Sequence, residues 1–212
     1  MKSANIQFGH DDWQEHKRET VYRGFFRMDR VELRHRTFDG GWTPVFSREL
    51  FERGEAVCVL LFDPQRAELV FTEQFRIGAL GDQRSPWLIE LVAGMVEEGE
   101  AVEEVAARET REEAGCEFSK LIPIHQYWAS PGGCSEKIHL FCGLFDSEGV
   151  AGIHGLEDEH EDIRLVRMGV EQAWQAMDEG IINNAASIIA LQWLKINYSE
   201  LVSGASSVSC ST

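Results

Sequence analysis

The sequence lacks paired cysteines and long apolar runs, and it has few basic residues. When present, these features mark disulfide-rich or zinc proteins, membrane proteins and nucleic-acid-binding proteins, respectively. Its five cysteines are scattered without a Cys-x-x-Cys pair, which argues against a disulfide framework and a zinc site and indicates a reducing compartment, the cytoplasm. No apolar run approaches the ~18 residues of a membrane span, and the polar N-terminal segment lacks the apolar core of a secretory signal. We therefore expect a soluble cytoplasmic protein without membrane contact.

Charge and composition set further limits. Lys and Arg number 20 against 36 Asp and Glu, so the formal net charge is −16. A chain this acidic is repelled by nucleic acid backbones and anionic lipids, and we expect neither as a partner. The hydrophobic fraction of 43% and the charged fraction of 26% are those of a globular protein. A length of 212 residues is enough to bury a core without disulfide or metal staples.

Hydrophobic periodicity and turn residues divide the chain into elements. Strands are predicted within 20–38, 56–62, 68–75, 87–93, 116–128, 138–145 and 163–168, with a hairpin joining the second and third. Helices are predicted over 101–114, over 170–177 and from Asn184 onward. This order indicates an α/β (α+β) protein. We expect a β-rich N-terminal section at 1–50, a core domain at 51–203 and a flexible tail at 204–212.

The helix predicted over 101–114 carries acidic residues on the face that should pack inward. At 100° per residue, Glu109 and Glu113 lie within about 20° of Val102 on the helical wheel, and Glu112 borders them. Three like charges on a partly desolvated face repel one another unless a cation neutralises them. Oxygen ligands at this density favour a hard divalent ion, Mg²⁺ or Mn²⁺, over zinc. The alternative is a solvated, Glu-rich helix.

The same segment carries a spaced motif. From Gly94 it reads GMVEEGEAVEEVAARETREEAGC, which resembles the Nudix hydrolase signature G-x5-E-x7-R-E-U-x-E-E-x-G-U, where U is a bulky apolar residue. The matching positions are Gly94, Glu100, Arg108, Glu109, Glu112, Glu113, Gly115 and Cys116. Thr110 stands where an aliphatic residue is usual. Because Thr is nearly isosteric with Val, this departure concerns packing and leaves the chemistry intact.

Resemblance to one branch of the family covers about residues 20–200. The segments AGMVEEGE, ASPGGCSE and GIHGLEDEHEDIR are similar to those of bacterial ADP-ribose pyrophosphatases, and Pro131 lies 15 residues after Cys116, a spacing that marks this subgroup. The resemblance implies a mixed β-sheet sandwiched between helices and divalent ions that bridge a diphosphate. It implies hydrolysis of ADP-ribose to AMP and ribose 5-phosphate, by a homodimer that exchanges its N-terminal section.

The resemblance also implies a metal site and a general base. The implied metal ligands are the backbone carbonyl of Ala93 and the side chains of Glu109, Glu112, Glu113 and Glu161, with Gly94, Glu100, Arg108 and Gly115 in support. The implied base is Glu159 in the acidic loop over 156–162, and Glu161 is the alternative. An acidic run is otherwise typical of a solvated surface. His160 is a further candidate base because imidazole titrates near neutral pH.

The resemblance implies four kinds of substrate contact. Arginines bind phosphate or ribose, and aromatic rings hold the adenine. Further residues reach in from a second subunit, and a turn lines the ribose end. The positions are Phe25, Phe26, Arg48, Glu49, Arg53, Arg76, Met95, Ser130, Pro131, Gly132 and Glu136. Each has an ordinary structural interpretation too. Arginines are commonly surface charges, phenylalanines pack in cores, and Ser-Pro-Gly-Gly forms turns without a ligand.

Two classes of function remain open from the sequence. The first is an enzyme, whose substrate is ADP-ribose or, alternatively, another nucleoside diphosphate sugar such as ADP-glucose or GDP-mannose, or NADH. The second is a non-catalytic Nudix domain that senses a nucleotide. The complete carboxylate set favours the enzyme, because a domain that only binds needs no base to activate water.

Overall fold

The computed structural model describes residues 6–156 and 160–208, with 205–208 described as backbone only. Contacts between residues divide the chain into two compact units. The first unit comprises residues 6–54 and 128–136, and the second comprises 55–127 and 137–208. A short segment from the middle of the chain therefore belongs to the N-terminal unit.

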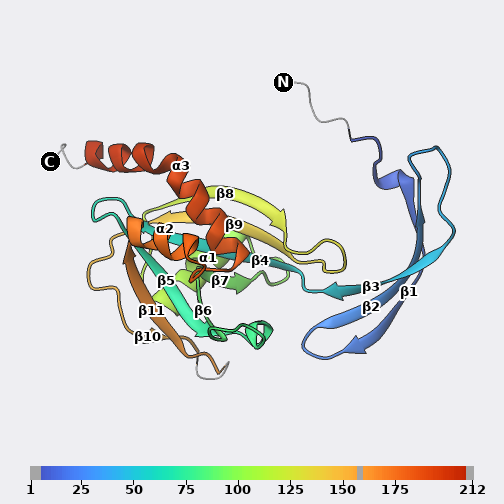
Figure 1. Ribbon diagram of the computed structural model, residues 1–212, viewed down its shortest axis with the longest axis horizontal. Helices are drawn as coiled ribbons and strands as arrows, with labels where there is room; N and C mark the ends of the chain where they lie inside the picture. Colours follow the sequence, from blue (N-terminus) through green and yellow to red (C-terminus); the bar gives the residue numbers. More distant parts are fainter. Residues whose placement is uncertain (1–5, 157–159, 209–212) are drawn as a thin grey trace. The chain divides into compact units, whose positions relative to one another are not determined.

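The first unit is built on a three-stranded antiparallel sheet in the order β1-β2-β3 (Figure 1). Its elements are the 3-10 helix η1 (His10–Asp12) and the strands β1 (Trp13–Arg23), β2 (Arg27–His35) and β3 (Phe46–Glu52). β1 begins before the predicted range and is exposed along its whole length. Because neither face of β1 is buried, its sequence has no apolar alternation from which to predict a strand.

The second unit is built on a mixed sheet in the order β10-β11-β5-β4-β9-β8, with β6 paired to β5 and β7 paired to β4. Its strands are β4 (Glu55–Asp63), β5 (Glu68–Phe75), β6 (Trp87–Glu90), β7 (Val92–Met95), β8 (Lys120–Trp128), β9 (Lys137–Leu144), β10 (Ile153–His154) and β11 (Ile163–Gly169). β4 and β5 form the predicted hairpin, and β4 runs parallel to β9.

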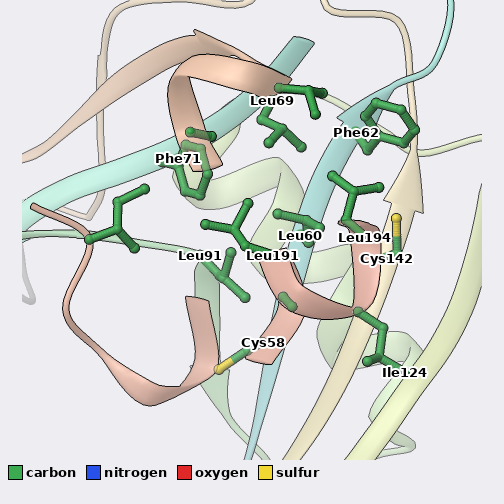
Figure 2. Packing of buried hydrophobic residues seen from close by; sticks show 14 of the residues in the cluster. Cys58, Leu60, Phe62, Leu69, Phe71, Leu91, Ile124, Cys142, Leu191 and Leu194 are labelled. Atoms are coloured by element: carbon green, nitrogen blue, oxygen red, sulfur yellow. The ribbon is translucent and has the colours of Figure 1, made fainter. Parts of the chain in front are cut away.

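Helices cover both faces of this sheet (Figure 1). The helices are α1 (Val102–Ala114), α2 (Val170–Asp178), α3 (Ala185–Val208) and the 3-10 helix η2 (Ile77–Ala79). Alternate residues of β4 enter two cores: Cys58, Leu60 and Phe62 pack with Leu191 and Leu194 of α3 (Figure 2), whereas Val57, Val59 and Leu61 pack with Val105 and Ala106 of α1. A mixed sheet between helices confirms the predicted fold class.

Local signals account for most element ends. Gly115 ends α1 with φ 61°, in the left-handed region that glycine tolerates. Asn184 caps α3, because its Oδ1 accepts the Ser187 backbone N–H at 3.1 Å. The sequence predicts a flexible tail from residue 204, whereas in the structure α3 continues through Gly204 to Val208. A single glycine within a helix costs only about 1 kcal/mol, so it need not end the helix. Among the described helices, none is long and apolar enough to span a membrane.

Candidate active site

The acidic face of α1 lies against β7. β7 pairs with β4, placing Ala93 opposite Cys58 and Gly94 opposite Val57. Val105 and Ala106 fix the helix on this part of the sheet by packing in the core with Val57 and Val59. The later turns of the same helix face therefore bring carboxylates to the β7 backbone.

Glu113 is the deepest of these carboxylates. It is 2% exposed, and its Oε2 accepts the Ala93 backbone N–H at 2.9 Å. Burial raises the pKa of Glu113 to about 8; Glu109 and Glu161 add to this rise, while the Ala93 N–H opposes it. Without a cation beside it, Glu113 therefore holds a proton at neutral pH.

Glu109 lies one turn before Glu113, with a side chain that is 13% exposed. Burial raises its pKa to about 7; the guanidinium of Arg108 opposes this, whereas Glu112 and Glu161 add to it. The carboxylate lies directly on Gly94, where an added Cβ would come 1.7 Å from Glu109 Oε1. A side chain at position 94 would therefore push the Glu109 carboxylate out of this place, which gives a reason for the glycine of the motif.

Arg108 supplies the positive charge of the cluster. Its guanidinium pairs with Glu100 at 3.1 Å, with Glu109 at 2.7 Å and with Glu112 at 3.2 Å. The hydrogen bond to Glu100 is the main reason why the pKa of Arg108 is raised, and Glu109 adds to it. One arginine thus faces three carboxylates, whereas the cation that lowers the pKa of the deeper Glu113 is Arg76.

These residues fit a hard divalent cation. The donors are carboxylate oxygens on one helix face, the chemistry that Mg²⁺ and Mn²⁺ prefer. A cation beside Glu109 and Glu113 would favour their ionised forms and so remove the cost of burying them. Within the described residues, no three His, Cys, Asp or Glu side chains are already gathered as a metal-binding group. Arg108 instead holds Glu109 and Glu112.

Two neighbouring segments add charge around α1. Arg76 follows β5, and its Nε donates to Glu90 Oε2 of β6 at 2.5 Å. In the acidic loop, the Glu161 backbone N–H donates to the Leu156 carbonyl at 3.2 Å, and the Glu161 carboxylate raises the pKa of both buried glutamates of α1. The predicted base, Glu159, lies outside the described residues.

The remaining predicted site residues, apart from Met95 at the end of β7, belong to the first unit. Arg53 pairs with Glu136 at 2.7 Å, and its guanidinium stacks on Phe26 with 4.4 Å to the ring centroid. Phe25 packs edge-on against Phe26 and is 89% exposed. An aromatic pair beside an arginine suits a planar base with a phosphate attached.

The Ser-Pro-Gly-Gly segment forms a turn, in which the Ser130 carbonyl accepts the backbone N–H groups of Gly133 and Cys134. Ser130, Pro131 and Gly132 are exposed at its tip. On β3, Arg48 stacks over Phe46 and Glu49 is exposed. The structure therefore gathers the predicted residues into two groups: Phe25, Phe26, Arg48, Glu49, Arg53, Ser130, Pro131, Gly132 and Glu136 in the first unit, and Arg76, Met95 and the α1 carboxylates in the second.

Sequence reasoning does not identify Glu90, although it holds Arg76. The signal in the sequence is weak but visible, because Glu90 is the lone charged residue in the run WLIELVA. A carboxylate within an otherwise apolar strand needs a partner when the strand is buried. The identity of that partner is a tertiary contact, which the sequence does not give.

Comparisons with known proteins show what this chain is similar to. A family model described as NUDIX domain matches residues 52–191. ADP-ribose pyrophosphatase of Escherichia coli (strain K12) is 50% identical over 196 residues, which cover 92% of this chain and 94% of that protein. ADP-ribose pyrophosphatase of Haemophilus influenzae is 47% identical over 186 residues, covering 86% of each.

A solved structure shares the fold. The crystal structure of an ADP compounds hydrolase aligns with a TM-score of 0.65 over 92% of this chain and 98% of that chain, at 23% identity. At this identity the likeness concerns the fold alone. The family model, by contrast, spans well over half of the chain and includes the whole acidic helix. The chain therefore belongs to the Nudix family.

Proposed function

We propose that this protein hydrolyses the pyrophosphate bond of ADP-ribose and releases AMP and ribose 5-phosphate. The observation that carries the proposal is the 50% sequence identity to a bacterial ADP-ribose pyrophosphatase over nearly the full length of both chains. The carboxylates of α1 support it, because a diphosphate cannot approach a chain with net charge −16 without cations to offset the repulsion.

We propose that the enzyme uses divalent metal ions, with Mg²⁺ preferred over Mn²⁺. The ligands would be Glu109, Glu112, Glu113, Glu161 and the carbonyl of Ala93. When bound, such ions neutralise the diphosphate and make its phosphorus more electrophilic. The protein prepares the site: the Ala93 N–H fixes the orientation of Glu113, and Arg108 holds Glu109 and Glu112 in place until the ions bind.

Proton transfer and substrate positioning fall to other side chains. Glu159 would accept a proton from the attacking water as the new P–O bond forms and the bridging P–O bond breaks. Arg76 would bind a phosphate oxygen. Arg53 and Phe26, already stacked on each other, would hold the nucleotide end. Positioning and charge neutralisation of this kind supply most of the catalysis in phosphoryl transfer.

We further propose a cytoplasmic homodimer. The first unit exposes large apolar side chains of the kind that interfaces cover, namely Trp13, Val21, Tyr22, Phe25, Phe38 and Val45. Cys116, Cys134 and Cys142 are free thiols, which supports a reducing compartment. Light scattering after size-exclusion chromatography tests the assembly, and a mass of one chain would contradict it.

Hydrolysis can be tested directly with the purified protein. Incubation with ADP-ribose and MgCl₂, followed by chromatography, should give AMP and ribose 5-phosphate, with slower turnover of ADP-glucose, GDP-mannose and NADH. Addition of EDTA should stop the reaction, and H₂¹⁸O would show which product takes the solvent oxygen. Binding of ADP-ribose with no turnover of any of these substrates, at any Mg²⁺ or Mn²⁺ concentration, would refute the proposal in favour of a nucleotide sensor.

A further inference from the structure

One buried amide nitrogen, on the side of the sheet that α1 covers, has no hydrogen-bond partner in the described part of the chain. Gln74 is 6% exposed, and its Nε2 has no hydrogen-bond partner among the residues that the structure describes. An unpaired buried amide destabilises the folded chain. Native proteins rarely keep such a group unless another state of the protein uses it, so each one calls for an explanation.

The strand register places Gln74 on the α1 side of the sheet. Val70 of β5 belongs to the core that α1 covers. Because successive side chains of a strand alternate between faces, Thr72 and Gln74, two and four positions later, face the same side as Val70. β5 pairs with β6 so that Thr72 lies opposite Glu90 and Gln74 lies opposite Leu88. Residues directly opposite each other share a face. Gln74 and Glu90 are therefore diagonal neighbours on the α1 side.

The ion pair between Arg76 and Glu90 spans the position of Gln74. Along β5, Gln74 lies between Thr72 and Arg76. Because Glu90 lies opposite Thr72, the guanidinium of Arg76 reaches back past Gln74 to pair with it. The Glu90 side chain is 17% exposed and that of Arg76 is 41% exposed. The Glu90 carboxylate is thus the more buried partner of the pair.

We propose that Gln74 is a positioning residue that donates its Nε2–H to Glu90 when Arg76 turns to a phosphate of the substrate. The proposal rests on the proposed function, in which Arg76 binds phosphate. If Arg76 left Glu90 with no replacement, a mostly buried carboxylate would lose its partner, and the cost would be subtracted from substrate affinity. The unpaired amide of Gln74, a diagonal neighbour within reach, removes that cost.

The variant Gln74→Met tests this exchange, because it keeps the length of the side chain and removes the donor. The KM for ADP-ribose should rise about tenfold while kcat changes less than about twofold, as expected when binding is lost equally from substrate and transition state. The thermal unfolding midpoint should not fall, since the variant loses no hydrogen bond in the free protein. Gln172→Met makes the same change at an exposed position of α2 and should alter neither quantity.

A double-mutant cycle with Glu90→Gln separates this role from a general packing effect. In the Glu90→Gln background no charge remains to be covered, so Gln74→Met should leave KM unchanged. An unchanged KM for Gln74→Met alone, an equal rise in both backgrounds, or a variant that fails to fold would overturn the inference. These results presuppose an active wild-type enzyme. A wild type that does not hydrolyse ADP-ribose overturns the proposed function, and the inference with it.

Discussion

Glu113 holds a proton in the metal-free protein because burial raises its pKa. Replacing Glu113 by a neutral residue should therefore stabilise the metal-free fold at high pH. A carboxyl whose pKa is higher in the folded chain than in the unfolded chain binds its proton more tightly when folded. The raised pKa therefore leaves the free energy of unfolding unchanged below pH 4.5, the ordinary pKa of the group. Its destabilising effect grows as the pH rises to about 8, the pKa of Glu113 in the folded protein. At about 1.4 kcal/mol per pH unit, the rise of the pKa from 4.5 to about 8 makes this cost about 5 kcal/mol at pH 9.

The variant Glu113→Gln removes this cost and keeps an oxygen that can accept the Ala93 N–H. In EDTA at pH 9, the free energy of unfolding of Glu113→Gln should exceed that of the wild type by a few kcal/mol, whereas at pH 5 the two should agree. Urea unfolding followed by tryptophan fluorescence measures both. With MgCl₂ the order should reverse, because an ion that binds only the folded wild type stabilises it.

The matched control is Glu103→Gln, which neutralises an exposed glutamate of the same helix and should change the unfolding free energy by less than about 0.5 kcal/mol. Turnover of ADP-ribose by Glu113→Gln should fall by orders of magnitude. A Glu113→Gln protein that is less stable than the wild type at pH 9 in EDTA would refute the view that this glutamate is buried at a cost for the sake of a cation.

Two further changes test other parts of the second unit. Gly94→Ala would place a methyl group where Glu109 Oε1 lies, so kcat should fall at least tenfold while circular dichroism stays native; full activity would contradict the close contact. Asp63 is buried and accepts hydrogen bonds from Ser147 and Arg66, which hold its pKa at about 2 despite burial. Its contribution is complete above pH 3.8 and is lost as the pH falls through 2, so Asp63→Asn should cost about 2 kcal/mol at pH 7, measured by urea unfolding, and nothing near pH 1. A pH-independent cost would show that packing, and not charge, explains the effect.

The sequence was most informative where a local pattern decides the structure. The apolar stripe of α1, the glycine that ends it and the Asn184 cap of α3 each depend on residues within a few positions of one another. The inward position of Glu109 and Glu113 also follows from helical periodicity alone. For this reason the face of the site could be predicted without coordinates.

Contacts between distant segments could not be predicted in this way. Arg76 and Glu90 meet because β5 and β6 pair, and Phe51 exchanges backbone hydrogen bonds with Gly133 and Ser135 across roughly 80 residues of chain. No local pattern encodes either pairing. The role of Glu159 stays a prediction, because it came from resemblance and that residue lies outside the described part of the chain.

The two-sided burial of β4 has a consequence for evolution. Consecutive residues of this strand, such as Val57 and Cys58, serve opposite cores, and both lie opposite the β7 backbone that carries the glutamate contacts. A substitution beneath α3 therefore displaces the same strand that supports α1 and its glutamates. Variants that adapt the enzyme to another temperature should accordingly change in pairs across β4, one residue for each core, so that the backbone between them keeps its place.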